Sequence, residues 1–127
     1  MSDKGRPVFD ASAVLPLMQN EMGADRLDGV RSNAVVSAVS VSEVLDKLVS
    51  KGMPQMLAAA SLDALHFEVA AFEPDDAVLS AEYISRNVSL GDRCFLACAR
   101  KYGTGWTADH DLARIGSNWL PPLTMFR

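Results

Sequence analysis

The sequence predicts an α/β fold in which helices cover both faces of a mostly parallel sheet. Short apolar segments typical of strands alternate with segments of helical periodicity along the chain. Such alternation builds strand–helix–strand units, and these units give parallel sheets. A length of 127 residues suits one domain, and a chain that is 49% hydrophobic and 22% charged is typical of a globular protein.

The first half of the chain predicts three strands and four helices. Residues 1–6 are polar and are expected to be loose. Pro16 is expected in or near the first turn of its helix, where a missing N–H costs no hydrogen bond. The expected elements are a strand at 7–9, helices at 13–22 and 24–30, a strand at 34–39, helices at 40–51 and 54–65, and a strand at 67–72.

The second half predicts three helices and two short strands. The helices are expected at 74–85, 92–102 and 112–115, and the strands at 105–108 and, as an edge strand, at 123–126. Cys94 and Cys98 lie one turn apart on the apolar helix at 92–102. Two cysteines in this spacing favour packing in the core over a disulfide framework or a zinc site.

The charge and the apolar runs exclude some classes of protein. A net charge of −4 argues against a protein that binds nucleic acid by electrostatics alone. It does not argue against a nuclease, because bound divalent cations reverse the field of a carboxylate cluster. The apolar runs are too short to span a membrane, and the N-terminus lacks the pattern of a signal peptide. We therefore expect a cytoplasmic protein that does not contact membranes.

Four acidic residues stand at the ends of predicted elements. Asp10 follows the first strand and Asp109 the fourth, while Glu43 and Asp92 fall in the first turns of the helices at 40–51 and 92–102. In open parallel sheets, ligands bind at the carboxyl ends of the strands where the strand order reverses. The sequence therefore predicts that these carboxylates meet at one edge of the sheet, Asp92 only if its helix begins there.

Two interpretations of these acids remain open at this stage. Each of them suits a helix cap: Ser40 and Glu43 fit a capping box, Ser89 and Asp92 fit another, and Asp10 and Asp109 precede helices. Taken together, four carboxylates in one cleft would repel one another unless a cation bound them. Oxygen ligands of this kind suit Mg²⁺ or Mn²⁺, and such an ion promotes phosphoryl displacement.

The residues around these acids resemble a known family. Residues 8–13 (VFDASA), 40–44 (SVSEV), 90–99 (LGDRCFLACA) and 107–113 (TADHDLA) resemble, in order and spacing, the four motifs of PIN-domain nucleases. The third and fourth motifs, with the short length, resemble the VapC toxins of toxin–antitoxin pairs. This resemblance covers nearly the whole chain.

The resemblance implies an α/β/α sandwich with four or five strands and a Mg²⁺- or Mn²⁺-dependent endoribonuclease. It implies an RNA substrate, a homodimer and a DNA-binding antitoxin as partner, for which we expect an apolar groove between the N-terminal helices. The implied metal ligands are Asp10, Glu43, Asp92 and Asp109. Ser12 and Thr107 would support these ligands through their hydroxyls. The sequence departs from the family at Gly105-Trp106, where two aliphatic residues are more usual.

Neighbouring residues and other functions leave alternatives open. Asp111 suits either a further ligand or the start of a helix, and Arg93 suits either a phosphate contact or a surface ion pair. A PIN-like module that binds without catalysis is a second function. A phospho-accepting receiver domain is less favoured, because Asp10 lacks a paired acid and no lysine follows Lys101. A dehalogenase-like phosphatase would need an aspartate in place of Ser12.

Overall fold

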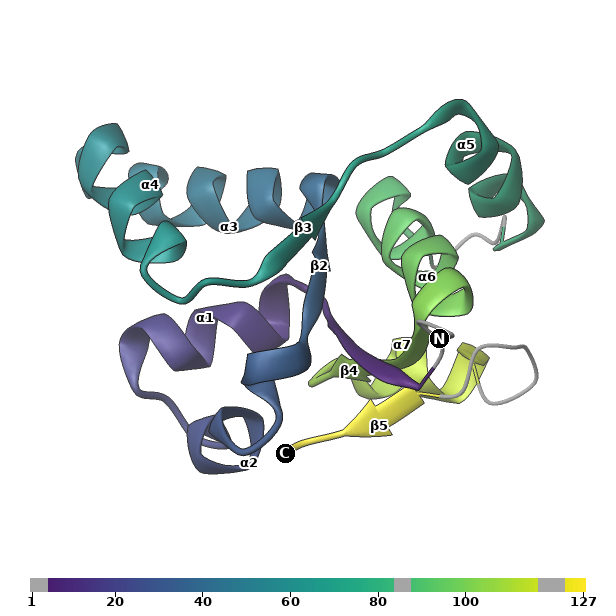
Figure 1. The fold of residues 1–127 in the computed structure, drawn as a ribbon, viewed down its shortest axis with the longest axis horizontal. Coiled ribbons are helices and arrows are strands. Elements are labelled where there is room, and N and C mark those ends of the chain that lie inside the picture. Colours follow the sequence, from purple (N-terminus) through teal and green to yellow (C-terminus); the bar gives the residue numbers. More distant parts are fainter. Residues whose placement is uncertain (1–4, 84–87, 117–122) are drawn as a thin grey trace.

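The core of the fold is a five-stranded parallel sheet (Figure 1). The computed structural model describes residues 5–83, 88–116 and 123–127, without the side chains of 115 and 116. The strand order is β3-β2-β1-β4-β5, and every neighbouring pair is parallel. This confirms the predicted fold class and the predicted edge strand. The strands are β1 (Arg6–Phe9), β2 (Val35–Ser37), β3 (Glu68–Ala70), β4 (Gly103–Thr107) and β5 (Leu123–Met125).

Helices pack on both sides of this sheet. Figure 1 shows α1 to α4 on one side and α5, α6 and α7 on the other, with α3 and α4 projecting as an arm. The α-helices are α1 (Ala11–Gln19), α2 (Ala24–Asp28), α3 (Ala38–Ser50), α4 (Gln55–Asp63), α5 (Pro74–Ser80), α6 (Leu90–Tyr102) and α7 (His110–Gly116). Short 3₁₀ helices, η1 (Arg31–Asn33) and η2 (Ala81–Tyr83), follow α2 and α5. The last two residues of the helix expected at 74–85 lie outside the described part of the chain.

Alternation along the strands explains the two layers of helices. Phe9 and Val36 belong to the core under α1 to α4, while Val8 and Val35 belong to the core under α6. Successive side chains of a strand point to opposite faces, so one apolar run supplies both cores. Cys94 and Cys98 are buried as free thiols, as predicted. Burial raises the pKa of the Cys98 thiol to about 12, so that it stays protonated.

The boundary between β2 and α3 differs from the prediction. We expected a strand at 34–39, but β2 ends at Ser37 and α3 begins at Ala38. The Ser37 hydroxyl accepts a hydrogen bond from the Val39 amide and caps the helix. Local capping here overrides the β-propensity of the apolar run. The predicted Ser40–Glu43 capping box is therefore wrong, and Glu43 lies in the second turn of α3.

The N-terminal region also corrects the prediction. Helix α1 begins at Ala11, two residues earlier than expected, because Asp10 caps it. Pro16 consequently lies in the second turn and not in the first. Arg6 is not loose: it begins β1, and its guanidinium forms an ion pair of 3.0 Å with Glu68.

The topology fixes where a site can form. After β1 the chain builds β2 and β3 on one side and then returns to add β4 and β5 on the other. Strands β1 and β4 therefore flank the point where the strand order reverses, and Phe9 pairs with Trp106 at their carboxyl ends. Asp10 follows Phe9 at this point, which is where parallel sheets bind ligands. None of the helices among the described residues is long and apolar enough to cross a membrane.

Candidate active site

Asp10 is the most deeply buried acid of the predicted set. Its side chain is 7% exposed, and both carboxylate oxygens accept hydrogen bonds. Oδ1 accepts from the Ser12 hydroxyl at 2.6 Å and from the Ala13 amide at 3.0 Å. Oδ2 accepts from the Thr107 hydroxyl at 2.5 Å. Asp10 is thus both the cap of α1 and a carboxylate in a fixed orientation.

The two hydroxyls on Asp10 connect it to the chain beyond β4. The Ser12 hydroxyl accepts from the Ala108 amide at 2.9 Å, and the Thr107 hydroxyl accepts from the Asp109 amide at 3.0 Å. Each hydroxyl therefore donates to Asp10 and accepts from the backbone that leads into α7. Two of these hydrogen bonds join residues nearly one hundred positions apart. The role of Ser12 and Thr107 in supporting metal ligands stays a prediction.

Asp92 lies at the start of α6, and this start is at the same edge of the sheet. Ser89 caps the helix by accepting from the Asp92 amide at 3.1 Å, as the sequence predicted. Burial raises the pKa of the Asp92 carboxyl, hydrogen bonds from Ser89 lower it, and the charge of Asp109 raises it. The prediction that Asp92 reaches the other acids required α6 to begin at this edge, and it does.

Glu43 reaches the same region from α3. Its carboxylate lies against the Cα of Gly91, where an added Cβ would come within 2.7 Å of the Glu43 Cδ. Burial raises the pKa of Glu43, and the charge of Asp92 raises it further, while Lys47 lowers it. Glu43 and Asp92 are therefore close enough to repel each other across the start of α6.

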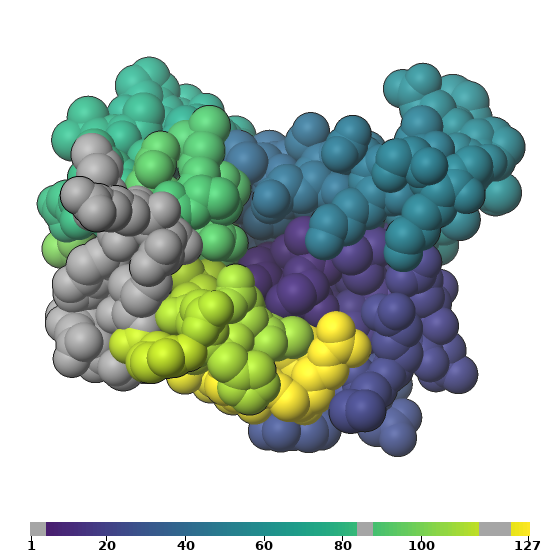
Figure 2. All heavy atoms as spheres, turned by 180° about the vertical axis from the view of Figure 1, so that it is seen from behind, coloured from purple at the N-terminus to yellow at the C-terminus, as the bar shows by residue number. Residues whose placement is uncertain are grey.

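Electrostatics link all four predicted acids through Asp92. Burial raises the pKa of Asp10 to about 6 against the lowering effect of its three hydrogen bonds, and the charge of Asp92 adds to the rise. The charge of Asp92 also raises the pKa of Glu43, and the charge of Asp109 raises the pKa of Asp92. Figure 2 shows this side of the molecule, where the purple start of α1 lies in a hollow between the blue α3, the green α6 and the lime-green α7.

Asp109 is exposed and caps α7, as the capping interpretation predicted. Its Oδ1 accepts from the Asp111 amide at 3.0 Å and from the Leu112 amide at 3.1 Å. Asp111 is at the start of α7 and forms an ion pair with Arg114. The Arg93 guanidinium donates a hydrogen bond to the Val88 carbonyl at 3.3 Å.

The acids do not form a finished metal site as they stand. Among the residues that the structure describes, no three histidine, cysteine, aspartate or glutamate side chains are grouped closely enough to hold a metal ion. The donor set nevertheless fits a hard divalent cation, because it consists of carboxylates, and the charge of Asp92 raises the pKa of both Asp10 and Glu43. Capping and metal binding do not exclude each other here, since a capping carboxylate keeps lone pairs free.

Comparisons with known proteins show the family and the fold of this chain. The profile of the PIN domain matches residues 8–118, which is most of the chain. The chain belongs to the PIN domain family. No curated protein sequence matches it.

Solved structures share the fold of this PIN domain at low sequence identity. The VapBC complex of Salmonella typhimurium bound to DNA matches with a TM-score of 0.74 and 12% identity over 97% of this chain and 99% of that one. VapBC2 of Rickettsia felis, bound to a DNA fragment from its promoter, matches with a TM-score of 0.71 and 14% identity over 94% and 97%. VapC20 of Mycobacterium tuberculosis, a toxin that cleaves the sarcin–ricin loop, matches with a TM-score of 0.68 and 17% identity over 87% and 95%.

The Gly105-Trp106 departure has a packing explanation in this PIN domain. Trp106 faces the α1 side, where its ring lies 6.3 Å from that of Phe9. Gly105 faces the α6 side, where an added Cβ would lie 2.7 Å from the ring of Phe95 and 2.6 Å from Leu123. Strand β4 thus has a large side chain on its α1 face and no side chain at the neighbouring position on its α6 face. The backbone leading to Thr107 stays paired with β1.

Sequence reasoning missed two residues next to the acids. Gly91 lies under the Glu43 carboxylate, and Lys47 acts on the charge of Glu43 from the next turn of α3. The spacing of four between Glu43 and Lys47 signals a shared helix face, but only the structure shows that this face borders the acids.

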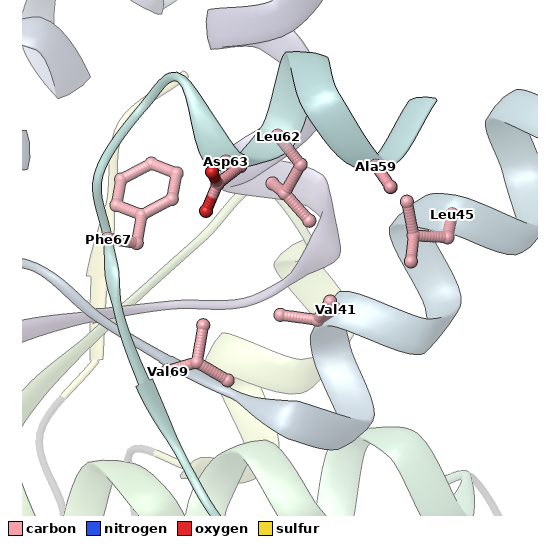
Figure 3. A pocket seen from close by; sticks show the side chains of 7 residues that line it. All are labelled: Val41, Leu45, Ala59, Leu62, Asp63, Phe67 and Val69. Atoms are coloured by element: carbon pink, nitrogen blue, oxygen red, sulfur yellow. The ribbon is translucent and has the colours of Figure 1, made fainter. Parts of the chain in front are cut away.

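A separate apolar pocket lies on the α3–α4 arm (Figure 3). It has a volume of about 200 Å³ and is lined by Val41, Leu45, Ala59, Leu62, Asp63, Phe67 and Val69. Apart from Asp63, its lining carries no charged group, so it is unsuited to catalysis on a phosphodiester. The apolar groove that we expected between the N-terminal helices stays a prediction.

Proposed function

We propose that this PIN domain is a Mg²⁺- or Mn²⁺-dependent endoribonuclease that hydrolyses RNA phosphodiester bonds. Asp10, Glu43, Asp92 and Asp109 would hold the metal. The observation that carries this proposal is the electrostatic linkage of these acids around a buried carboxylate whose pKa is raised to about 6. An acid so costly to ionise in the absence of a ligand suits a site that a cation completes.

In such a site the metal would act on the substrate, and the residues of the chain would hold the metal ligands in place. A bound Mg²⁺ or Mn²⁺ would supply an activated water and stabilise the charge on the phosphate. Ser12 and Thr107 hold the Asp10 carboxylate by hydrogen bonds to both of its oxygens. Asp92 and Asp109 are held at the first turns of α6 and α7, so that three of the four carboxylates have backbones set by a cap.

Cleavage assays of Glu43→Gln test the proposal. The parent should cut RNA with Mn²⁺ or Mg²⁺ and not with EDTA, and Glu43→Gln should lose at least about 100-fold in rate, because an amide is a poor ligand for a hard cation. Its free energy of unfolding should change by less than about 0.5 kcal/mol, since Glu43 does not cap α3. The matched control is Asp46→Asn, an exposed acid one turn along α3, which should cut like the parent.

The same assay decides between catalysis and binding alone. If the parent binds RNA but never cuts it with either metal, the chain is a binding module and the nuclease proposal fails. If Glu43→Gln cuts like the parent, Glu43 is not a ligand. Loss of cleavage in the control would point to a general effect of surface charge.

We further propose that the protein acts as a VapC-type toxin, with an antitoxin and a second copy of itself as partners. Two of the structures that share its fold are toxin–antitoxin complexes. Exposed apolar side chains on the arm and β3 also favour a protein partner, Met56 being 82% exposed and Val69 53%. Light scattering after size-exclusion chromatography should give a dimer alone and a larger complex when the protein of the adjacent gene is co-expressed. A monomer without a co-purifying protein would contradict this.

A further inference from the structure

Lys47 is a cation that acts directly on one carboxylate of the site, that of Glu43. It lies on α3 one turn after Glu43, is exposed, and its charge stabilises the ionised Glu43. The principal charges that act on Asp10 and Asp92 are acidic. Lys47 therefore places a positive charge beside Glu43, on the α3 side of the acids.

Most other cations in the described part of the chain are neutralised by neighbours. Ion pairs engage Arg6, Arg31, Arg100, Lys101 and Arg114. The guanidinium of Arg93, beside Asp92 in the sequence, is turned to the Val88 carbonyl. Lys47 has no carboxylate oxygen within ion-pair distance among the residues described, although Glu43 shares its helix face. Its ammonium is therefore available to an incoming anion.

An RNA strand needs a cation at this place. The chain carries a net charge of −4, and its candidate site gathers acids. Most of the affinity of proteins for nucleic acids comes from lysine and arginine contacts to phosphates. A divalent ion in the site would neutralise the reacting phosphate, but the adjacent phosphates of the strand would still meet repulsion.

We propose that Lys47 binds a phosphate of the RNA strand next to the one that reacts, on the α3 side of the site. This inference rests on the proposed ribonuclease function. It also gives the path of the RNA strand over the protein surface beyond the carboxylates. The strand passes from the start of α6 across Glu43 and along α3. A lysine suits this task, because its ammonium is a mobile point charge that does not require one phosphate geometry.

A purely structural role for Lys47 predicts different behaviour. A glutamate four residues before a lysine stabilises a helix slightly, by about 0.3–0.5 kcal/mol. Loss of that contact would lower stability a little and would leave the salt dependence of RNA binding unchanged. A phosphate contact makes binding depend on salt, because each contact releases counterions from the strand.

Kinetics at several salt concentrations test the proposal with Lys47→Gln, Lys47→Arg and the matched control Lys51→Gln. Lys51 is exposed and is the C-cap residue of α3, four residues after Lys47. Lys47→Gln should raise the half-saturating RNA concentration about 5- to 10-fold, with the maximal rate and the half-saturating Mn²⁺ unchanged. The slope of log(kcat/KM) against log[salt] should become shallower by about 0.7. Lys47→Arg should restore most of the affinity, and Lys51→Gln should match the parent.

Each other outcome overturns the inference. An unchanged salt slope removes the phosphate contact, and a lower maximal rate with weaker Mn²⁺ binding shows that Lys47 acts through Glu43. An equal loss in Lys51→Gln shows diffuse attraction by the helix surface. If the parent does not cut RNA, the ribonuclease proposal fails. The role of Lys47 is then tested by RNA binding, measured as the anisotropy of labelled RNA with the parent and the Lys47 variants at the same salt concentrations. Absence of RNA binding in that assay defeats both.

Discussion

Asp10 and Glu43 border the same hollow but are held in different ways. Asp10 is 7% exposed, and three hydrogen bonds fix its carboxylate. Glu43 is half-buried and is positioned by packing against Gly91. Burial raises the pKa of both, but only at Asp10 do several hydrogen bonds oppose that rise.

This difference shows how one site combines a rigid and an adjustable acid. Asp10, as the cap of α1 at the end of β1, cannot move without breaking the helix start. The helix start does not depend on Glu43, since its backbone lies in the second turn of a helix whose cap is Ser37. We therefore expect changes at Asp10 to act on both stability and activity, and changes around Glu43 to act on metal binding almost alone.

Asp10→Asn should have the largest effect. Cleavage should fall at least about 100-fold, because an amide replaces a metal-binding carboxylate. In EDTA the variant should be more stable than the parent at pH 7. The folded parent has a carboxyl pKa of about 6 against 3.8 for the ordinary group, so it binds more protons than the unfolded chain between these values. Its stability thus falls as pH rises through this range, by up to about 3 kcal/mol.

Urea melts from pH 4 to pH 7.5 measure this effect as the difference between the two proteins. The difference in the free energy of unfolding should be small at pH 4 and should grow up to pH 7. The titration of the other acids affects both proteins equally and cancels in this difference. Asp25→Asn, an exposed acid in the first turn of α2, is the control and should follow the parent at every pH. A difference that is constant with pH would show that Asp10 is not costly to ionise, and the contrast with Glu43 would be lost.

Gly91→Ala should have a smaller effect, confined to the Glu43 side. The new methyl group would lie 2.7 Å from the Glu43 Cδ, so the flexible carboxylate has to turn away. We expect the half-saturating Mn²⁺ concentration to rise about 10-fold. The free energy of unfolding should stay the same or rise by up to about 1 kcal/mol, because alanine favours the helix over glycine. Thermal melts with increasing Mn²⁺ measure binding without relying on cleavage.

Gly29→Ala is the matched control for this substitution. Its added Cβ would meet only the Arg26 carbonyl at 3.6 Å, which is an ordinary contact. It should leave Mn²⁺ binding unchanged. If Gly91→Ala also binds Mn²⁺ like the parent, the position of the Glu43 carboxylate does not matter, and Glu43 is not a ligand.

The order of elements could be predicted from the sequence because it depends on local patterns. Periodicity identified the helices and strands, and Gly103 ends α6 where expected. The boundaries at Ser37 and Ala11 were missed, since a single capping side chain outweighed the apolar run in one case and the proline rule in the other. The miss at Ser37 moved Glu43 from the first turn to the second turn of its helix and removed the predicted capping box.

The sequence by itself determined the fold class, the family motifs and the places of Asp10, Asp92 and Asp109 at the ends of elements. These features follow from short-range spacing, which the chain carries without folding. Only the tertiary structure decided that Thr107 and Ser12 close on Asp10, that Gly91 supports Glu43 and that Lys47 borders the acids while Arg93 donates to the Val88 carbonyl. Such contacts join residues far apart in the chain, and their geometry depends on how α3 and α6 pack across the end of the sheet.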